Sequence, residues 1–179
     1  MSIIIGLIDP NNHLYIAADK RAIRSSGIID DNYKKLLPLR KNLYFGMTGI
    51  AELGLMIYKK VTELPTFNEM SVQDITNAFD IQFKEMNLDS TILVAGKFEN
   101  NEAFIWNKNT SGETRFIKRD KKDILYSINT NNNLDKFEPK FREEVIKSHG
   151  NLITAIKNTI EYASTIDKTI SKNFDIFQL

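Results

Sequence analysis

The 179-residue sequence contains no cysteine, which excludes disulfide bonds, thiolate metal sites and a cysteine nucleophile. Its two histidines, His13 and His149, fall at a predicted hairpin tip and a predicted helix end, so we do not expect a Ser-His-Asp triad. No segment approaches the roughly 20 apolar residues that a membrane helix needs. The apolar run behind Met1 stops at Asp9-Pro10, too early for a signal peptide. We therefore expect a soluble, cytoplasmic protein with no membrane partner.

The sequence also lacks an excess of charge of either sign. It has 24 basic and 23 acidic side chains and a formal net charge of +1, whereas attraction to nucleic acid requires a clear basic surplus. There is no GxxxxGK phosphate-binding loop, so the chain gives no reason to expect ATP binding. The pair Asp30-Asp31 has no histidine or cysteine beside it and is interpreted as a turn. We expect no nucleic-acid partner, no metal and no cofactor.

The chain length suits a single domain over residues 1–179. Apolar and β-branched runs bounded by polar turns predict strands, and apolar residues at helical spacing predict helices. The predicted strands cover residues 3–8, 13–18, 28–29, 35–37, 43–47, 91–96, 103–106, 114–117, 124–127 and 174–177. The predicted helices cover residues 49–64, 72–86, 138–147 and 151–165, and residues 129–133 are predicted as a polar loop.

These elements occur in runs of one type: strands, two helices, strands, two helices and one strand. Such segregation favours antiparallel sheets with helices packed outside them, over a parallel sheet with alternating helices. Two stacked sheets between two helix layers would use every element. The predicted fold class is therefore α+β, a four-layer αββα sandwich of two antiparallel sheets between helix layers.

The first two predicted strands form a hairpin that begins almost at the first residue. A turn centred on residues 10–11 or 11–12 would place Ser2 opposite Asp19 or Arg21, by antiparallel pairing alone. The charged residues 19–21 follow directly on the apolar residues 16–18. This strand is therefore expected to run from the core into a charged site that includes Ser2.

Ser2 becomes the N-terminal residue if Met1 is removed, and it then carries a hydroxyl and an α-amine together. An α-amine has an unperturbed pKa of about 7.7–8.0, so a useful fraction is neutral at pH 7 and can accept the hydroxyl proton. A nearby lysine ammonium would favour the alkoxide. A backbone N–H at a helix N-terminus could bind the oxyanion, and Gly49, at a strand-to-helix transition, is the candidate.

Four segments in the first third of the chain resemble proteasome β-subunits and the related bacterial HslV-type peptidases, which are N-terminal-nucleophile hydrolases. That family has an N-terminal threonine, an aspartate ending the second strand, a lysine sixteen residues later and a glycine fourteen beyond that. Asp19, Lys35 and Gly49 reproduce both later spacings, while the interval from Ser2 is one residue longer than usual. The turn over residues 9–12 is expected to absorb the difference. The matching segments are residues 2–6, 16–22, 32–36 and 46–51.

By position, the resemblance implies that Ser2 is the nucleophile, Lys35 its activator, Asp19 the partner of Lys35 and Gly49 the oxyanion donor. Asp167 fits the second site aspartate of the family, because it follows a long predicted helix and precedes the last predicted strand.

Two auxiliary positions depart from the family pattern. Ile170 stands where a serine is usual, and Thr130 is the substitute for the other auxiliary serine. The residues that match the family's specificity pocket have a bulk that favours a small or medium apolar substrate side chain, and ordinary core packing is the alternative interpretation. These residues are Ala22, Tyr33, Met47 and Ala51.

The predicted function is therefore that of a threonine-type peptidase with Ser2 as nucleophile. The resemblance implies peptide or protein substrates, a homo-oligomeric ring or stack that encloses the site, and an ATPase unfoldase as partner. Two alternatives stay open. One is a non-peptidase amidase or acyltransferase on the same machinery, and the other is a catalytically silent structural subunit that retains Met1.

Overall fold

The computed structural model describes residues 2–23, 27, 29–85, 90–130 and 132–179. Met1, Ile28, Met86 and Asn131, on which parts of the sequence predictions fall, lie outside the described residues. The described strands are β1 (Ile3–Ile8), β2 (Leu14–Asp19), β3 (Ala22–Ile23), β4 (Ile29–Asp30), β5 (Leu36–Arg40), β6 (Leu43–Thr48), β7 (Thr91–Lys97), β8 (Ala103–Asn109), β9 (Thr114–Lys118), β10 (Leu125–Thr130) and β11 (Phe174–Gln178). The helices are α1 (Ala51–Thr62), the short 3-10 helix η1 (Phe67–Glu69), α2 (Val72–Lys84), α3 (Leu134–Lys147) and α4 (Leu152–Ile166).

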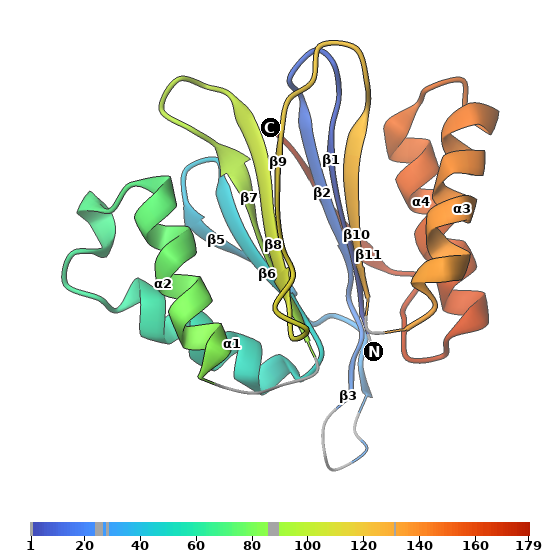
Figure 1. Cartoon of the computed structure of the whole chain (residues 1–179). Coiled ribbons are helices and arrows are strands. Elements are labelled where there is room, and N and C mark those ends of the chain that lie inside the picture. The colour runs from blue at the N-terminus through green and yellow to red at the C-terminus, as the bar shows by residue number, and fades with distance from the viewer. Residues whose placement is uncertain (1, 24–26, 28, 86–89, 131) are drawn as a thin grey trace.

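Two large antiparallel sheets face each other in the middle of the molecule (Figure 1). Within the described residues, one sheet has the strand order β10-β1-β2-β11 and the other has the order β5-β6-β7-β8-β9. The helices α1 and α2 lie outside the second sheet, and α3 and α4 lie outside the first (Figure 1). The predicted α+β class with two antiparallel sheets is confirmed. A separate small hairpin, β3-β4, follows β2.

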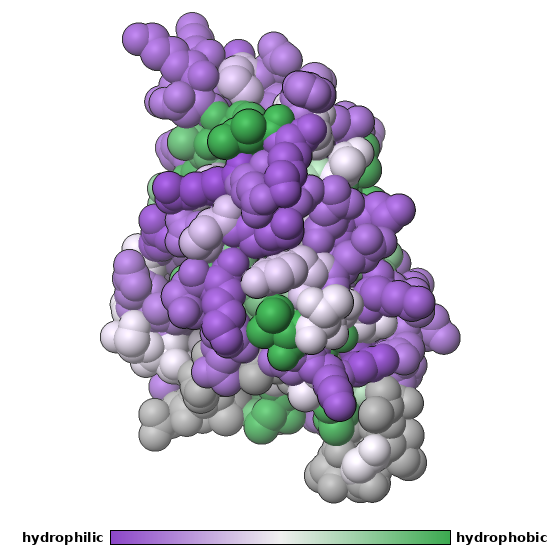
Figure 2. Space-filling model, turned by 90° about the vertical axis from the view of Figure 1, so that its right-hand side faces the viewer, coloured by the Kyte–Doolittle hydropathy of each residue, from purple (hydrophilic) through white to green (hydrophobic). Residues whose placement is uncertain are grey.

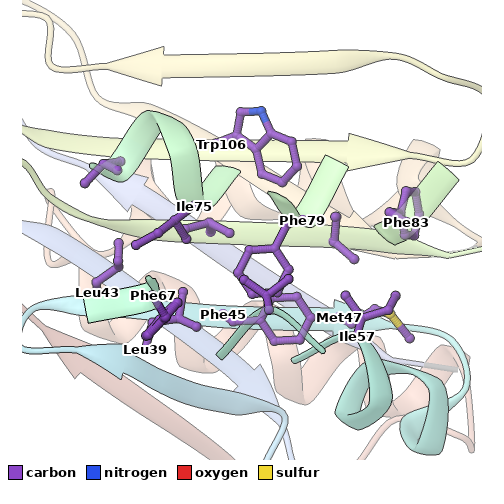
Figure 3. Packing of buried hydrophobic residues seen from close by; sticks show 14 of the residues in the cluster. Leu39, Leu43, Phe45, Met47, Ile57, Phe67, Ile75, Phe79, Phe83 and Trp106 are labelled. Carbon is purple, nitrogen blue, oxygen red and sulfur yellow. The ribbon is translucent and has the colours of Figure 1, made fainter. Parts of the chain in front are cut away.

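Apolar side chains form one cluster in each gap between layers. Residues of β6, α1, α2, β7 and β8 build the largest cluster, in which the Phe45 and Phe79 rings stack with centroids 4.6 Å apart (Figure 3). A second cluster joins β1, β2 and β10 to α3 and α4. The third lies between the two sheets. All six residues of β1 are buried because this central strand is covered on both faces.

Local sequence signals account for the starts of α2 and α4. Ser71 caps α2 and forms a reciprocal capping box with Asp74. The side chain of Asn151 accepts a hydrogen bond from the N–H of Thr154 at the start of α4. The predicted loop over residues 129–133 is wrong at its first two positions, because β10 continues to Thr130 through its pairing with β1.

The register of the β1-β2 hairpin differs by one residue from the predicted alternatives. The loop is centred on Asn11, and Ile4 pairs with Ala18, so Asp19 comes opposite Ile3. Continued by one residue, this register puts Ser2 opposite Lys20, and the predicted pairing with Asp19 or Arg21 is wrong. The cause is an odd-numbered loop, in which Asp9 accepts the N–H of His13 and Asn12 adopts a left-handed conformation with φ of 70°.

The outer face of α3 and α4 is largely hydrophilic (Figure 2). Ile146 of α3 and Ile153 of α4 are among the exposed apolar residues. No helix within the described residues is both long and apolar enough to cross a membrane.

Candidate active site

Asp19, the last residue of β2, is completely buried. Its Oδ1 accepts hydrogen bonds from the backbone N–H of Ile3 at 2.9 Å and from Lys35 Nζ at 2.7 Å. Its Oδ2 accepts the backbone N–H groups of Arg21 at 3.1 Å and Ser171 at 3.2 Å. A buried carboxylate is costly unless it is paired and hydrogen-bonded, and these four donors meet that requirement. Asp19 thereby holds together four segments that are distant in sequence.

Lys35 directly precedes β5, and its side chain is only 4% exposed. Burial lowers the pKa of the Lys35 ammonium below its ordinary value, the Asp19 carboxylate opposes that shift, and the Arg21 charge adds to it. The result is a cation held in one place that releases its proton more readily than a surface lysine. Such a group can stabilise a neighbouring anion and exchange a proton with it.

A pocket opens beside this ion pair, and Ser2, Lys35 and Gly49 all line it. Ser2 is 3% exposed, and its position is set by the next residue, Ile3, whose N–H is bound to Asp19. Three residues expected to act as nucleophile, activator and oxyanion donor therefore border one space, and the fourth, Asp19, contacts the activator directly.

The rest of the pocket wall is mainly apolar and includes the four residues predicted to line a specificity pocket. Tyr33 and Ala51 meet on this wall, since the Tyr33 hydroxyl donates a hydrogen bond to the Ala51 carbonyl at 3.3 Å. Met47 is buried against Gly54 of α1, where an added Cβ would come 3.2 Å from the Met47 Cε. The pocket-lining residues from the predicted set are Ala22, Tyr33, Met47 and Ala51.

Gly49 lies between the end of β6 and the start of α1. Its φ of 100° is a conformation that side chains strongly disfavour, and it lets the chain turn sharply at the pocket. The helix α1 begins at Ala51, so the positive end of its dipole lies at the pocket as well. Backbone N–H groups at such a helix start are suited to binding an oxyanion.

The loop after α4 reaches the site through a residue that the sequence did not single out. The Asp167 carboxylate accepts the N–H and hydroxyl of Thr169, at 2.8 and 2.6 Å, and so shapes the loop. Ile170 is 1% exposed and packs into the core below α4. Ser171, 2% exposed, is the residue whose N–H binds Asp19. A serine is thus present near the site one position after Ile170.

Thr130 lies on the strand next to Ser2 but faces other partners. It pairs with Ile3 across β10 and β1, and its hydroxyl donates to the Asn132 carbonyl at 2.9 Å. It lines a second pocket between the sheets, together with Asn107 and Asn129.

An ion pair between Arg21 and Asp31 supports the site from outside. Arg21 Nη2 donates to Asp31 at 2.9 Å, and Nη1 donates to the Lys168 carbonyl. The hydrogen bonds of Arg21 hold the pKa of the Asp31 carboxyl below its ordinary value, with a smaller contribution from the Ser171 side chain. Sequence alone indicated that Arg21 lies at this end of the hairpin. It carried no signal for Ser171, which is 152 positions from Asp19.

No protein-family model matches this sequence, and no curated protein matches it. Solved structures do match. Eukaryotic HslV from Trypanosoma brucei has a TM-score of 0.70 at 12% identity, with 99% of this chain and 98% of that chain covered. Anbu (ancestral beta-subunit) from Yersinia bercovieri has a TM-score of 0.72 at 12% identity, covering 98% and 80%. The Gly-1 mutant of Anbu from Hyphomicrobium sp. strain MC1 has a TM-score of 0.74 at 11% identity, covering 100% and 82%. At these identities the likeness is one of fold, and this chain has the fold of HslV and Anbu.

Proposed function

We propose that this chain is an N-terminal-nucleophile hydrolase of amide bonds, with Ser2 as nucleophile after removal of Met1. The observation that carries the proposal is the buried Lys35-Asp19 ion pair, 2.7 Å long, in a pocket that Ser2 and Gly49 also line. A buried ion pair of this kind is not required for folding, because well-packed apolar residues of similar volume often replace such pairs without loss of stability. Its place beside a hydroxyl supports a role in chemistry.

In the proposed reaction, the Ser2 Oγ attacks the amide carbonyl carbon while its proton passes to the neutral α-amine of the same residue. The Lys35 ammonium stabilises the developing alkoxide, and Asp19 keeps that ammonium oriented. The backbone at Gly49 binds the oxyanion. The C–N bond then breaks, the leaving amine takes up the proton, and an ester on Ser2 remains. Water hydrolyses this ester, which releases the acid and restores the hydroxyl.

Peptide bonds are the substrate we propose, in a proteasome-like or HslV-like peptidase. The shared fold with HslV and Anbu supports this assignment to the four-layer N-terminal-nucleophile class. The apolar wall of the pocket supports acceptance of an apolar side chain on the acyl side of the bond. We further propose a single domain over residues 1–179 that self-associates into a homo-oligomer in the cytoplasm and works with an ATPase unfoldase.

The central test replaces the nucleophile. Ser2→Ala should abolish hydrolysis of fluorogenic peptides, whereas the control Ser148→Ala should leave it unchanged, because the Ser148 hydroxyl bonds to the Val145 carbonyl at the end of α3 and Ser148 lines neither pocket. Intact mass should show protein lacking Met1, and a hydroxyl-directed electrophile should add its mass to Ser2. Unchanged turnover in Ser2→Ala would reject the proposal.

A non-peptidase amidase is the second candidate, favoured by the auxiliary positions. Ile170 is buried in the core, and the Thr130 hydroxyl is engaged by Asn132. Cleavage of small amides without cleavage of unfolded casein would favour this candidate. Met1 retained on every molecule from the native cell would instead indicate a silent structural subunit.

A further inference from the structure

The space between the two sheets changes from apolar to polar towards β10. Near β2 it is filled by residues such as Ile16 and Ile105. At β10 it holds Asn107, Ser127 and Asn129, none of which is more than 5% exposed. Asn107 Nδ2 donates to the Ser127 hydroxyl and, at 3.2 Å, to Asn129 Oδ1. This small network lies at the bottom of the second pocket.

The network leaves one buried donor unused. Asn129 Nδ2 has no hydrogen-bond partner within the described structure, although it is shielded from solvent. An unsatisfied buried N–H is unfavourable, because the group has lost its hydrogen bonds to water without gaining others. In this orientation Asn129 Oδ1 accepts hydrogen bonds from Asn107 and from the Ser127 hydroxyl. Its Nδ2 is thus a buried donor on a pocket-lining residue, and it lacks an acceptor within the described structure.

Two independent strand registers place this pocket next to the candidate active site. In one sheet, Ile3 pairs with Thr130, so the residue after Ser2 is one strand away from a residue of the second pocket. In the other sheet, Thr48 pairs with Thr91, so the residue before Gly49 is likewise one strand away from the pocket. Neighbouring strands lie about 4.8 Å apart. Ser2 and Gly49 thus stand between the two pockets.

The rim of the pocket is neutral overall. Glu113 and Arg115 both line it from β9 and its preceding turn, and neither side chain forms an ion pair with the described residues. The first residue of α3, Leu134, lines it too, so the positive end of that helix dipole lies nearby. A neutral amide can accept a hydrogen bond from Asn129 and donate one to Glu113, so it satisfies both sides of the pocket.

We propose that the second pocket binds a carboxamide on the leaving-amine side of the substrate, with its oxygen on Asn129 Nδ2. This inference rests on the proposed function for the direction of the substrate, since the apolar pocket takes the acyl side. The carboxamide comes either from a glutamine or asparagine side chain or from a backbone peptide group. A site built around a buried donor discriminates against analogues that leave the donor unpaired.

The first test does not depend on turnover. Crystals of Ser2→Ala soaked with N-acetylglutamine methylamide should show a ligand amide oxygen about 3 Å from Asn129 Nδ2. Placement of the side-chain oxygen or of a backbone oxygen there identifies the source. Water alone at Nδ2, an adventitious additive only, or the ligand bound only elsewhere would overturn the proposal, whether or not the enzyme is active.

The second test uses cleavage of peptides that differ at the residue after the scissile bond. Glutamine should exceed norleucine there by about tenfold in kcat/KM, which corresponds to one well-made buried hydrogen bond. Asn129→Asp removes the donor and should erase this preference. The matched control Asn100→Asp, at the far end of the β7-β8 hairpin, should keep it. Turnover without any preference would reject the side-chain source, and together with crystals in which no ligand oxygen lies on Asn129 Nδ2 it would reject the subsite. Absence of turnover would reject the hydrolase proposal alone.

Discussion

Two of the lysines that the structure describes are buried, and the contrast between them separates a candidate catalytic group from a structural ion pair. Lys35 and Lys108 have side chains only 4% and 6% exposed, and each pairs with one aspartate. The partner of Lys35, Asp19, is completely buried. The partner of Lys108, Asp80, is 24% exposed and also binds Lys84 at 2.8 Å.

The two ion pairs differ in the groups that surround them. Lys108 joins β8 to α2 across the outer layers, and its aspartate is held by a second cation. Lys35 has an aspartate whose remaining bonds all go to backbone N–H groups, and the lysine lines a pocket next to a serine. Burial of a charge is therefore a weak indicator of function by itself. Lys108 lines a pocket too, together with Asp80 and Lys84. What distinguishes Lys35 is that Ser2 and Gly49 line the pocket beside it and that, among the described residues, no second cationic side chain bonds to its aspartate.

Replacing each lysine in turn tests most directly whether the two residues have different roles. Lys35→Met should lower peptide turnover by about 100- to 1,000-fold, the usual cost of losing an electrostatic contact to the reacting oxygen. Lys108→Met should leave turnover unchanged. Steady-state assays on both variants measure the difference.

Lys35→Met leaves Asp19 as a buried, uncompensated carboxylate, so folding needs its own control. The double variant Asp19→Asn, Lys35→Met carries no such charge and should fold, with turnover still lost. A folded double variant that retains full turnover would contradict the catalytic interpretation of Lys35.

A second contrast lies in the pH dependence of the two pairs. The folded-state pKa of Lys35 is lowered, so turnover should fall as pH rises through a value below that of an ordinary lysine. Asp19→Asn removes the group that raises this pKa, so residual activity should fall at still lower pH. The unfolded state binds more protons between the lowered and the ordinary pKa, so the free energy of unfolding should rise with pH across that window.

The pair at Asp80 responds at the acidic end instead. Burial acts to raise the pKa of Asp80, but Lys108 and Lys84 outweigh it and hold the pKa below its ordinary value. The stability from this pair is complete above the ordinary aspartate pKa and is lost as pH falls through the lowered one. Denaturant unfolding at several pH values, on wild type, Lys35→Met and Lys108→Met, separates the two windows. An alkaline slope that persists in Lys35→Met would count against the assignment.

The smallest effects are expected on stability, from changes to the two lysines that pair with Asp80. Lys108→Met should lower the free energy of unfolding by about 1–2 kcal/mol, less than for a fully buried pair because Asp80 keeps some solvent and a second partner. Lys84→Gln removes an exposed cation and should leave the melting temperature unchanged. Thermal unfolding compares the two, and an equal loss in both variants would show that Asp80 needs each lysine alike.

Much of the site could be read from local sequence. The pairing of Asp19 with Lys35 was implied by the resemblance to N-terminal-nucleophile hydrolases, and the strand-to-helix transition indicated Gly49. The pocket residues Ala22 and Met47 also fall where they were expected. The roles of these residues stay predictions until the variants are measured.

The parts that failed depend on loop geometry and distant contacts. The hairpin register was wrong by one residue because Asp9 and Asn12 build an odd-numbered loop. Thr130 belongs to a strand because β1 pairs with it. Ser171 was overlooked because the family pattern pointed to the neighbouring position 170. In the structure Ile170 is buried in the core, and Ser171 is the residue that contacts Asp19.

The sequence by itself determined the order and type of the main elements, the hairpin at the N-terminus and the charged residues that end it, because periodicity and turn chemistry are local properties. Only the tertiary structure decided which donors saturate Asp19, where Asn129 leaves an unpaired N–H and which serine enters the site. These depend on sheet packing that joins segments more than a hundred residues apart, and no local pattern encodes the geometry of such contacts.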